Sequence, residues 1–277
     1  MLTVGLSLLA ALTYGSADFC GGLASRRMPA AVVVVLSQAA GLGLLAAVYP
    51  FVPTRYTAGD LAWGAAAGVF GAIGIAALYA ALAVGRMGVV SPVTAVIGAS
   101  VPVVWGLCSG ERPGAAALAG IGLAFVAVAL VSTDARTKRI SPREPGLLPA
   151  VVSGSAIGLL YVLLAQAHRD SGLAVVAAAR LMSIPLLLLY ALVRREPLRP
   201  PRGLAGLLAL AGGLDMAANV LYVLAARAGL LAVAAVLTSL YPAATVFLAR
   251  LVLDERLNAV QWAGVACAAA GILLIAL

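Results

Sequence analysis

Long runs of apolar residues, separated only by short polar segments, constrain this chain more than any other feature of its sequence. A helix needs about 20 apolar residues to cross a bilayer. Charged residues make up 10% of the chain, whereas a soluble domain carries about 25%. The runs lie at residues 3–23, 30–50, 61–83, 88–108, 115–132, 147–167, 173–193, 203–226, 231–251 and 259–277. Because they do not alternate as the strands of a membrane barrel do, they predict ten transmembrane helices.

The second half of the chain repeats the first in register at a distance of 144 residues. Gly85, Thr94, Glu111, Arg112 and Gly120 recur as Gly229, Thr238, Glu255, Arg256 and Gly264. Since each copy has five spans, an odd number, the second copy enters the membrane from the opposite side. The sequence therefore predicts an all-α integral membrane protein with two inverted five-helix repeats, 1–133 and 147–277, joined by a polar linker at 134–146. This design is typical of secondary transporters, which bind substrate near the midplane between the repeats.

The net charge of +8 gathers on one side of the predicted membrane. Thirteen Lys and Arg fall in loops 24–29, 84–87, 133–146, 194–202 and 250–258, four fall in the other loops, and the last is Arg180. Because positive loops stay in the cytoplasm, both termini are expected on the outer face. The same placement explains the charge without a nucleic-acid partner.

The motifs of several other function classes are missing from the sequence. It contains no P-loop sequence, and the cysteines at 20, 108 and 267 have neither metal-site nor disulfide spacing. No set of nucleophile, base and orienting group is apparent. We therefore expect neither an enzyme nor a bound metal or cofactor, and a driving force that comes from an ion gradient or from the substrate's own gradient.

Short motifs in a characteristic order carry a resemblance to a known family. They are Tyr14-Gly15, the segment YAALAVG at 79–85, Gly110-Glu111-Arg112, Gly120, Tyr222, Gly229, Pro242, Asp254-Glu255-Arg256 and Gly264. Over essentially its whole length the chain resembles the drug/metabolite transporter superfamily, in particular the EamA-type ten-span proteins. The resemblance implies a carrier of small metabolites, with a central cavity lined by spans one, three, four, six, eight and nine. It also implies cytoplasmic termini, the opposite of the charge-based orientation, and both orientations stay open.

Three ionisable residues fall inside apolar spans, where charge is costly and marks a functional site by default. Asp215 shares one helical face with Asn219 and Tyr222, at i, i+4 and i+7. Asp18 lies one turn from Tyr14 on the first span, and Arg180 lies within the seventh. The candidates for substrate binding or proton coupling are Asp215, Asn219, Tyr222, Arg180, Asp18 and Tyr14.

Each charged candidate also has a structural interpretation. Asp215 could exchange a proton or hold a cationic group of the substrate, or it could simply pair with Arg180. Arg180 could bind a substrate carboxylate or phosphate in fork geometry, or pair with either aspartate. Asp18 could form an interfacial ion pair with Arg26 or Arg27. The two copies differ at these positions, because the shift sets Asp18 against Val162, Arg180 against Leu36 and Asp215 against Gly71.

Other residues are expected to serve mainly as scaffold. The duplicated pairs Glu111-Arg112 and Glu255-Arg256 would each open the helix that closes a repeat and complement its dipole, with gating as the alternative. His168 is the only histidine and is expected at the surface. Helix packing is expected at Gly64, Gly68, Gly154 and Gly158, and helix interruptions at Pro92, Pro102, Pro185 and Pro242.

We therefore expect a secondary-active carrier that exports a small polar metabolite, such as an amino acid, across the bacterial inner membrane by alternating access. Its partners would be that small-molecule substrate, membrane lipids and a coupling proton, and a homodimer is one assembly the sequence allows. One alternative is an exporter of lipophilic cations or drugs, although aromatic residues make up only 6% of the chain. The other is a membrane subunit that transports nothing.

The charge-based orientation can be tested with reporters fused after Leu277. A periplasmic reporter should be active there and a cytoplasmic reporter inactive, because loops with few basic residues face outward. Activity of the cytoplasmic reporter would reverse the assignment in favour of the orientation that the family resemblance implies.

Overall fold

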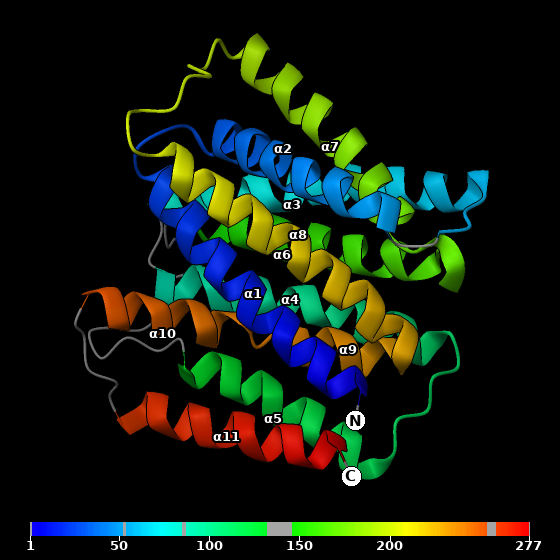
Figure 1. The fold of residues 1–277 in the computed structure, drawn as a ribbon. Helices are drawn as coiled ribbons and strands as arrows, with labels where there is room; N and C mark the ends of the chain where they lie inside the picture. The colour runs from blue at the N-terminus through cyan, green and yellow to red at the C-terminus, as the bar shows by residue number, and fades with distance from the viewer. Residues whose placement is uncertain (1, 52–53, 85–86, 132–145, 254–258, 277) are drawn as a thin grey trace.

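The protein is a bundle of helices in a computed structural model that describes residues 2–51, 54–84, 87–131, 146–253 and 259–276. Figure 1 shows the helices running between two ends of the molecule, with the start of α1 and the end of α11 at the same end. The α-helices are α1 (Leu2–Ser25), α2 (Ala30–Val48), α3 (Ala58–Val84), α4 (Met87–Cys108), α5 (Ala115–Val131), α6 (Leu147–Gln166), α7 (Ala174–Val193), α8 (Ala205–Ala228), α9 (Leu231–Thr238), α10 (Tyr241–Leu253) and α11 (Ala259–Ala276). Two short 3-10 turns, η1 (Tyr49–Phe51) and η2 (Arg169–Ser171), follow α2 and α6.

The helices coincide with the apolar runs that the sequence contains. Within the described residues, six helices are long and apolar enough to cross a membrane: α1, α2, α3, α6, α7 and α8. Shorter apolar helical stretches occupy the other four predicted spans. Each peptide group in a hydrocarbon environment needs a hydrogen-bond partner, and a helix supplies it within the span. The chain is thus a multi-pass helical membrane protein.

The ninth predicted span is the exception, because it is two helices rather than one. Helix α9 ends at Thr238 and α10 begins at Tyr241. Pro242 lies at the start of α10, and its ring cannot donate the main-chain hydrogen bond that would continue α9. The interruption predicted at Pro242 therefore coincides with a break. Those predicted at Pro92, Pro102 and Pro185 were wrong, since these prolines lie within the unbroken helices α4 and α7.

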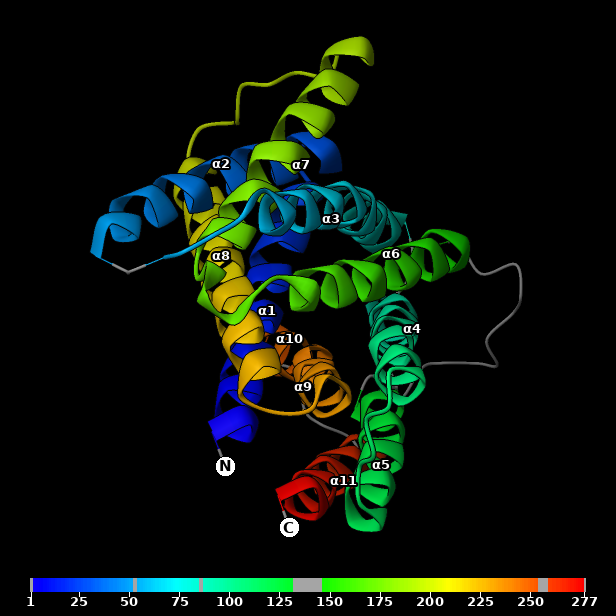
Figure 2. The same cartoon turned by 90° about the vertical axis from the view of Figure 1, so that its right-hand side faces the viewer.

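The core lies between helices from the two halves of the sequence, which interleave. Helix α1 packs on α8, α2 on α7 and α8, α3 on α6 and α7, and α4 on α6 and α9. Helices α5 and α11 pack on each other and form a pair at one edge of the bundle (Figure 2). A movement of one half against the other would therefore change most of the helix contacts in the molecule.

Glycines allow several of these helices to approach closely. A side chain at Gly64 or Gly68 of α3 would collide with the main chain of α7, at Val175 and Ala179. On α6, Gly154 and Gly158 face α4 in the same way. The packing role predicted for these four glycines matches their position at the contacts between the two halves, where small residues let helix backbones meet.

Two neighbouring glycines of α8 provide a matched test of this packing. A Cβ atom at Gly212 would run into the main-chain carbonyl of Ser37 on α2, whereas one at Gly213 would meet only Leu44 Cδ2, at 3.7 Å. We expect Gly212→Ala to lower the free energy of unfolding by about 1–3 kcal/mol, as overpacking does. Gly213→Ala should leave it unchanged or raise it by up to about 1 kcal/mol, because alanine favours helix. Thermal unfolding in detergent measures both, and equal effects would contradict the close approach of α2 and α8.

Candidate functional site

A small cavity lies among α1, α3, α6, α7, α8 and the first residue of α10. Its volume is about 20 Å³, enough for about one water molecule. Its lining residues are Tyr14, Asp18, Gly71, Ile75, Leu78, Ile157, Leu160, Tyr161, Arg180, Asp215, Asn219 and Tyr241. A metabolite would not fit into this volume without movement of the lining residues, and we call this arrangement the closed form.

Five of the six candidates predicted from the sequence line this cavity: Asp215, Asn219, Arg180, Asp18 and Tyr14. The sixth candidate, Tyr222, is fully buried directly beside it. The expected lining by spans one, three, six, eight and nine agrees with the structure. Span four contributes none of the described lining residues, and Arg180 adds span seven instead.

Arg180 and Asp215 form an ion pair across the cavity. Nη2 of Arg180 donates to Oδ2 of Asp215 at 2.5 Å, and the two side chains are 4% and 17% exposed. The amide of Asn219 donates to the main-chain oxygen of Asp215 at 2.8 Å and to its Oδ1 at 3.3 Å. Both carboxylate oxygens of Asp215 therefore have donors, and the structural interpretation left open for this residue describes the closed form.

Asp18 is the second carboxylate in the cavity lining, and unlike Asp215 it has no hydrogen-bond donor or arginine beside it among the described residues. Its side chain is 8% exposed and makes no hydrogen bond or ion pair with any residue that the structure describes. The expected ion pair with Arg26 or Arg27 is not formed, because both arginines lie exposed beyond the end of α1. With the Arg180 and Asp215 charges offsetting each other, an ionised Asp18 leaves the cavity with a net negative charge.

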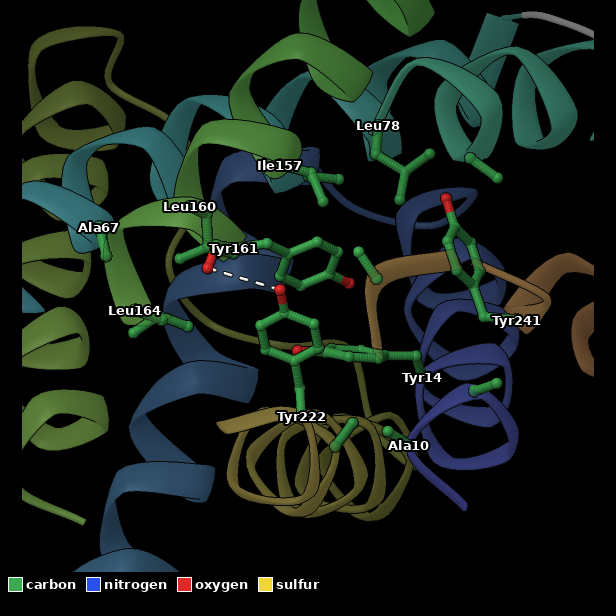
Figure 3. Packing of buried hydrophobic residues seen from close by; sticks show 14 of the residues in the cluster. Ala10, Tyr14, Ala67, Leu78, Ile157, Leu160, Tyr161, Leu164, Tyr222 and Tyr241 are labelled. Carbon is green, nitrogen blue, oxygen red and sulfur yellow. Dashed lines mark hydrogen bonds between the residues drawn. The ribbon is translucent and has the colours of Figure 1, made fainter. Parts of the chain in front are cut away.

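Tyrosines also line the cavity: Tyr14, Tyr161 and Tyr241 belong to its lining, and Figure 3 shows them with Tyr222 among the buried hydrophobic residues. The rings of Tyr161 and Tyr222 stack with centroids 4.2 Å apart, and Tyr14 lies tilted against Tyr161 at 6.1 Å. The Tyr222 hydroxyl donates to the main-chain oxygen of Tyr161 at 3.5 Å. The sequence had singled out Tyr14 and Tyr222 by their spacing from aspartates. It missed Tyr241, which follows the break between α9 and α10 and carries no such signal.

Three buried donors at the cavity have no hydrogen-bond partner among the described residues: Tyr14 Oη, Tyr241 Oη and Arg180 Nε. A buried polar group without a partner costs about 1–3 kcal/mol, so water or a bound solute is expected to satisfy these three. The described residues contain no group of three or more His, Cys, Asp and Glu side chains that could hold a metal ion.

Glu111 and His168 turn out to connect the two halves. Glu111 accepts hydrogen bonds from the main-chain N–H groups of Leu231 and Ala232, at 2.7 and 3.1 Å, and so caps α9. The prediction that Glu111 opens its own helix was wrong, because α5 begins only at Ala115. The duplicated pair Glu255-Arg256 lies outside the described residues. His168 is 74% exposed, as expected, but its ring nitrogen lies 3.0 Å from the buried carboxylate of Asp60, a residue the sequence gave no reason to select.

The Arg180–Asp215 pair yields a double-mutant prediction. Arg180→Met should lower the free energy of unfolding by about 3 kcal/mol, because it leaves a buried carboxylate unpaired. Adding Asp215→Leu should recover most of that loss, since the double variant has no buried charge to compensate. Thermal unfolding of the single and double variants measures the coupling, and additive losses would contradict a direct ion pair.

Comparisons with known proteins support the same kind of molecule. Residues 144–277 match the model of the EamA-like transporter family. A solved structure, described only as the crystal structure of a protein, is similar with a TM-score of 0.77 and 18% identity, covering 98% of this chain and 95% of the other. At that identity the likeness shows the fold alone. No curated protein matches the chain at a significant level. The match covers the second half of the chain, and over residues 144–277 the sequence is thus that of an EamA-like transporter.

Proposed function

We propose that the protein is a secondary-active transporter of the drug/metabolite type that exports a small polar metabolite, such as an amino acid, across the bacterial inner membrane. The observation that carries the proposal is the enclosed, charged cavity between helices of the two halves, with Asp18, Arg180 and Asp215 in its lining. Charge is kept inside a membrane bundle at a cost, and substrate and proton pathways are its usual setting.

The helix contacts support alternating access by inverted repeats. In the internal repeat α1 corresponds to α6, α2 to α7 and α3 to α8. The contact of α1 with α8 therefore corresponds to that of α6 with α3, and the contact of α2 with α8 to that of α7 with α3. All four contacts are present. The contact of α4 with α6 likewise becomes that of α9 and α10 with α1, whereas α2 on α7 and α5 on α11 map onto themselves. This pattern is expected of repeats related by a two-fold axis in the membrane plane, and it favours the division into 1–133, the linker 134–146 and 147–277.

Asp18 and Arg180 suit the two ends of an amino acid. The Asp18 carboxylate, without a partner in the closed form, would receive the ammonium group. The Nε–H of Arg180 has no partner in the part of the chain that the structure describes, and it would donate to the substrate carboxylate. Proton coupling was expected at Asp215, but the donors from Arg180 and Asn219 make Asp18 the better candidate, since a proton and an ammonium group would compete for it.

The tyrosines favour a second candidate, an exporter of lipophilic cations. Aromatic residues are few in the chain as a whole, yet Tyr14, Tyr161 and Tyr241 line the cavity and Tyr222 stacks behind them. Aromatic faces attract cations, with a larger energy when the site is dry. A membrane subunit that transports nothing would have no use for an enclosed charged cavity, and it predicts no solute flux.

The test begins with binding and proceeds to flux. Purified protein is screened for thermal stabilisation by amino acids, other metabolites and aromatic cations, because a ligand of the folded state raises its apparent stability. The solutes that stabilise it are then assayed for counterflow in liposomes. We expect Asp18→Asn to reduce flux at least about tenfold and to flatten its dependence on pH, with Asp170→Asn as the control because that carboxylate is exposed.

The outcomes separate the candidates. Stabilisation and flux with amino acids support the first, and the same results with aromatic cations alone support the second. Stabilisation by no solute together with no flux would remove both. Full pH-dependent flux in Asp18→Asn with loss in Asp215→Asn would return the coupling role to Asp215.

A further inference from the structure

A buried carboxylate joins the two halves at one end of the bundle. Asp60, at the start of α3, is 1% exposed. Its Oδ2 accepts hydrogen bonds from the main-chain N–H and the hydroxyl of Thr57, at 2.8 and 2.9 Å. Its Oδ1 accepts one from the main-chain N–H of His168 at 2.6 Å, and the His168 ring Nδ1 lies 3.0 Å from the same atom. We name Asp60, Thr57 and His168 the Asp60 cluster.

Capping of helix α3 explains the two contacts of Asp60 with Thr57 but not the two with His168. The bonds with Thr57 are local and are typical of a helix start. The two contacts with His168 are different, because His168 is 108 residues away and belongs to the other half of the chain. Hydrogen bonds to a charged acceptor are roughly twice as strong as neutral ones, so this is a firm connection between the start of α3 and the segment that follows α6.

Two further polar contacts between the halves lie at the same end of the molecule, the right-hand end in Figure 1. The main-chain N–H of Arg55 donates to the main-chain oxygen of Asp170 at 2.9 Å. Glu111 caps α9 where the α4–α5 and α8–α9 connections meet. All of these contacts would have to break or rearrange if the halves separated on this face.

The duplicated sequence cannot form an Asp60 cluster at the opposite end. The shift of 144 residues sets Asp60 against Leu204, Thr57 against Pro201 and His168 against Ala24. Leu204 and Ala24 are buried and apolar, and neither can accept or donate a side-chain hydrogen bond. The connection is therefore a property of one face.

We propose that the Asp60 cluster stabilises one gate of the transporter in its closed state. It keeps the cavity closed toward the face with few basic residues, and its contacts between the halves break when substrate passes on that face. The inference rests on the proposed alternating access and adds its regulation. When the gate opens, water replaces His168 as the donor to Asp60, so the contact can break and re-form in each cycle. The opposite gate would depend on apolar packing at the corresponding positions.

The test measures access to the cavity from each face. Ile75, a lining residue of α3, is changed to cysteine in a full-length chain whose three native cysteines are replaced by alanine. A membrane-impermeant maleimide is then applied to vesicles of both orientations. We expect Asp60→Asn to speed labelling from the His168 face about tenfold, the effect of weakening hydrogen bonds to a charge, without a rise from the other face.

Two companion variants keep the result interpretable. His168→Ala removes the ring contact but keeps the main-chain donor, so it should act in the same direction with a smaller factor, even if Asp60→Asn folds poorly. Asp170→Asn makes the same chemical change as Asp60→Asn on an exposed neighbour and should alter labelling from neither face.

Two outcomes would overturn the gate: unchanged labelling from the His168 face in both cluster variants, or an equal rise from both faces, which signals general loosening. Labelling needs no substrate, so it is independent of the transport assay. One-sided labelling without any solute flux would support the gate and remove the proposed function, whereas flux with unaltered labelling would remove only the gate.

Discussion

A bilayer offers no water to the peptide groups inside it, and the rest of this structure follows from that constraint. Every span has to satisfy its own backbone, which makes it a helix. Helices cannot rely on the hydrophobic effect to associate in lipid, so they depend on close contact. Glycines such as Gly68 and Gly212 provide that contact between the halves. The charged side chains of Asp18, Arg180 and Asp215 then meet at a cavity between the helices, and that of Asp60 lies at the start of α3.

The centre and the ends use their polar groups differently. In the cavity, Arg180 and Asn219 donate to the Asp215 carboxylate. Asp18 and the hydroxyls of Tyr14 and Tyr241 have no hydrogen-bond partner among the residues that the structure describes. At one end, by contrast, the carboxylates of Asp60 and Glu111 are satisfied by donors from the other half. The cavity thus has room for little more than a water and keeps polar groups available, whereas the carboxylates at that end of the bundle are engaged in contacts between the halves.

The two copies of the internal repeat differ in sequence both at the cavity and at the Asp60 cluster. Asp215 and its counterpart Gly71 both line the cavity, so a charge in one copy faces a position without a side chain in the other. Asp60 and His168 likewise correspond to Leu204 and Ala24. The residues that the copies share, such as Gly120 and Gly264, provide a common scaffold. The residues that they do not share distinguish one cavity wall and one face from the other.

Local properties of the sequence determined the helices, their approximate ends, the small residues at their contacts and the face that carries Asp215, Asn219 and Tyr222. Apolar length and helical periodicity record these features directly. Only the tertiary structure decided that Arg180 pairs with Asp215 while Asp18 stays unpaired, that Glu111 caps α9, and that Asp60 binds His168. Those partners lie between 35 and 120 residues apart, and no periodic pattern encodes which distant residues meet. The sequence predicted interruptions at Pro92, Pro102, Pro185 and Pro242 alike, and only the structure shows that, of these four, Pro242 alone lies at a break between helices.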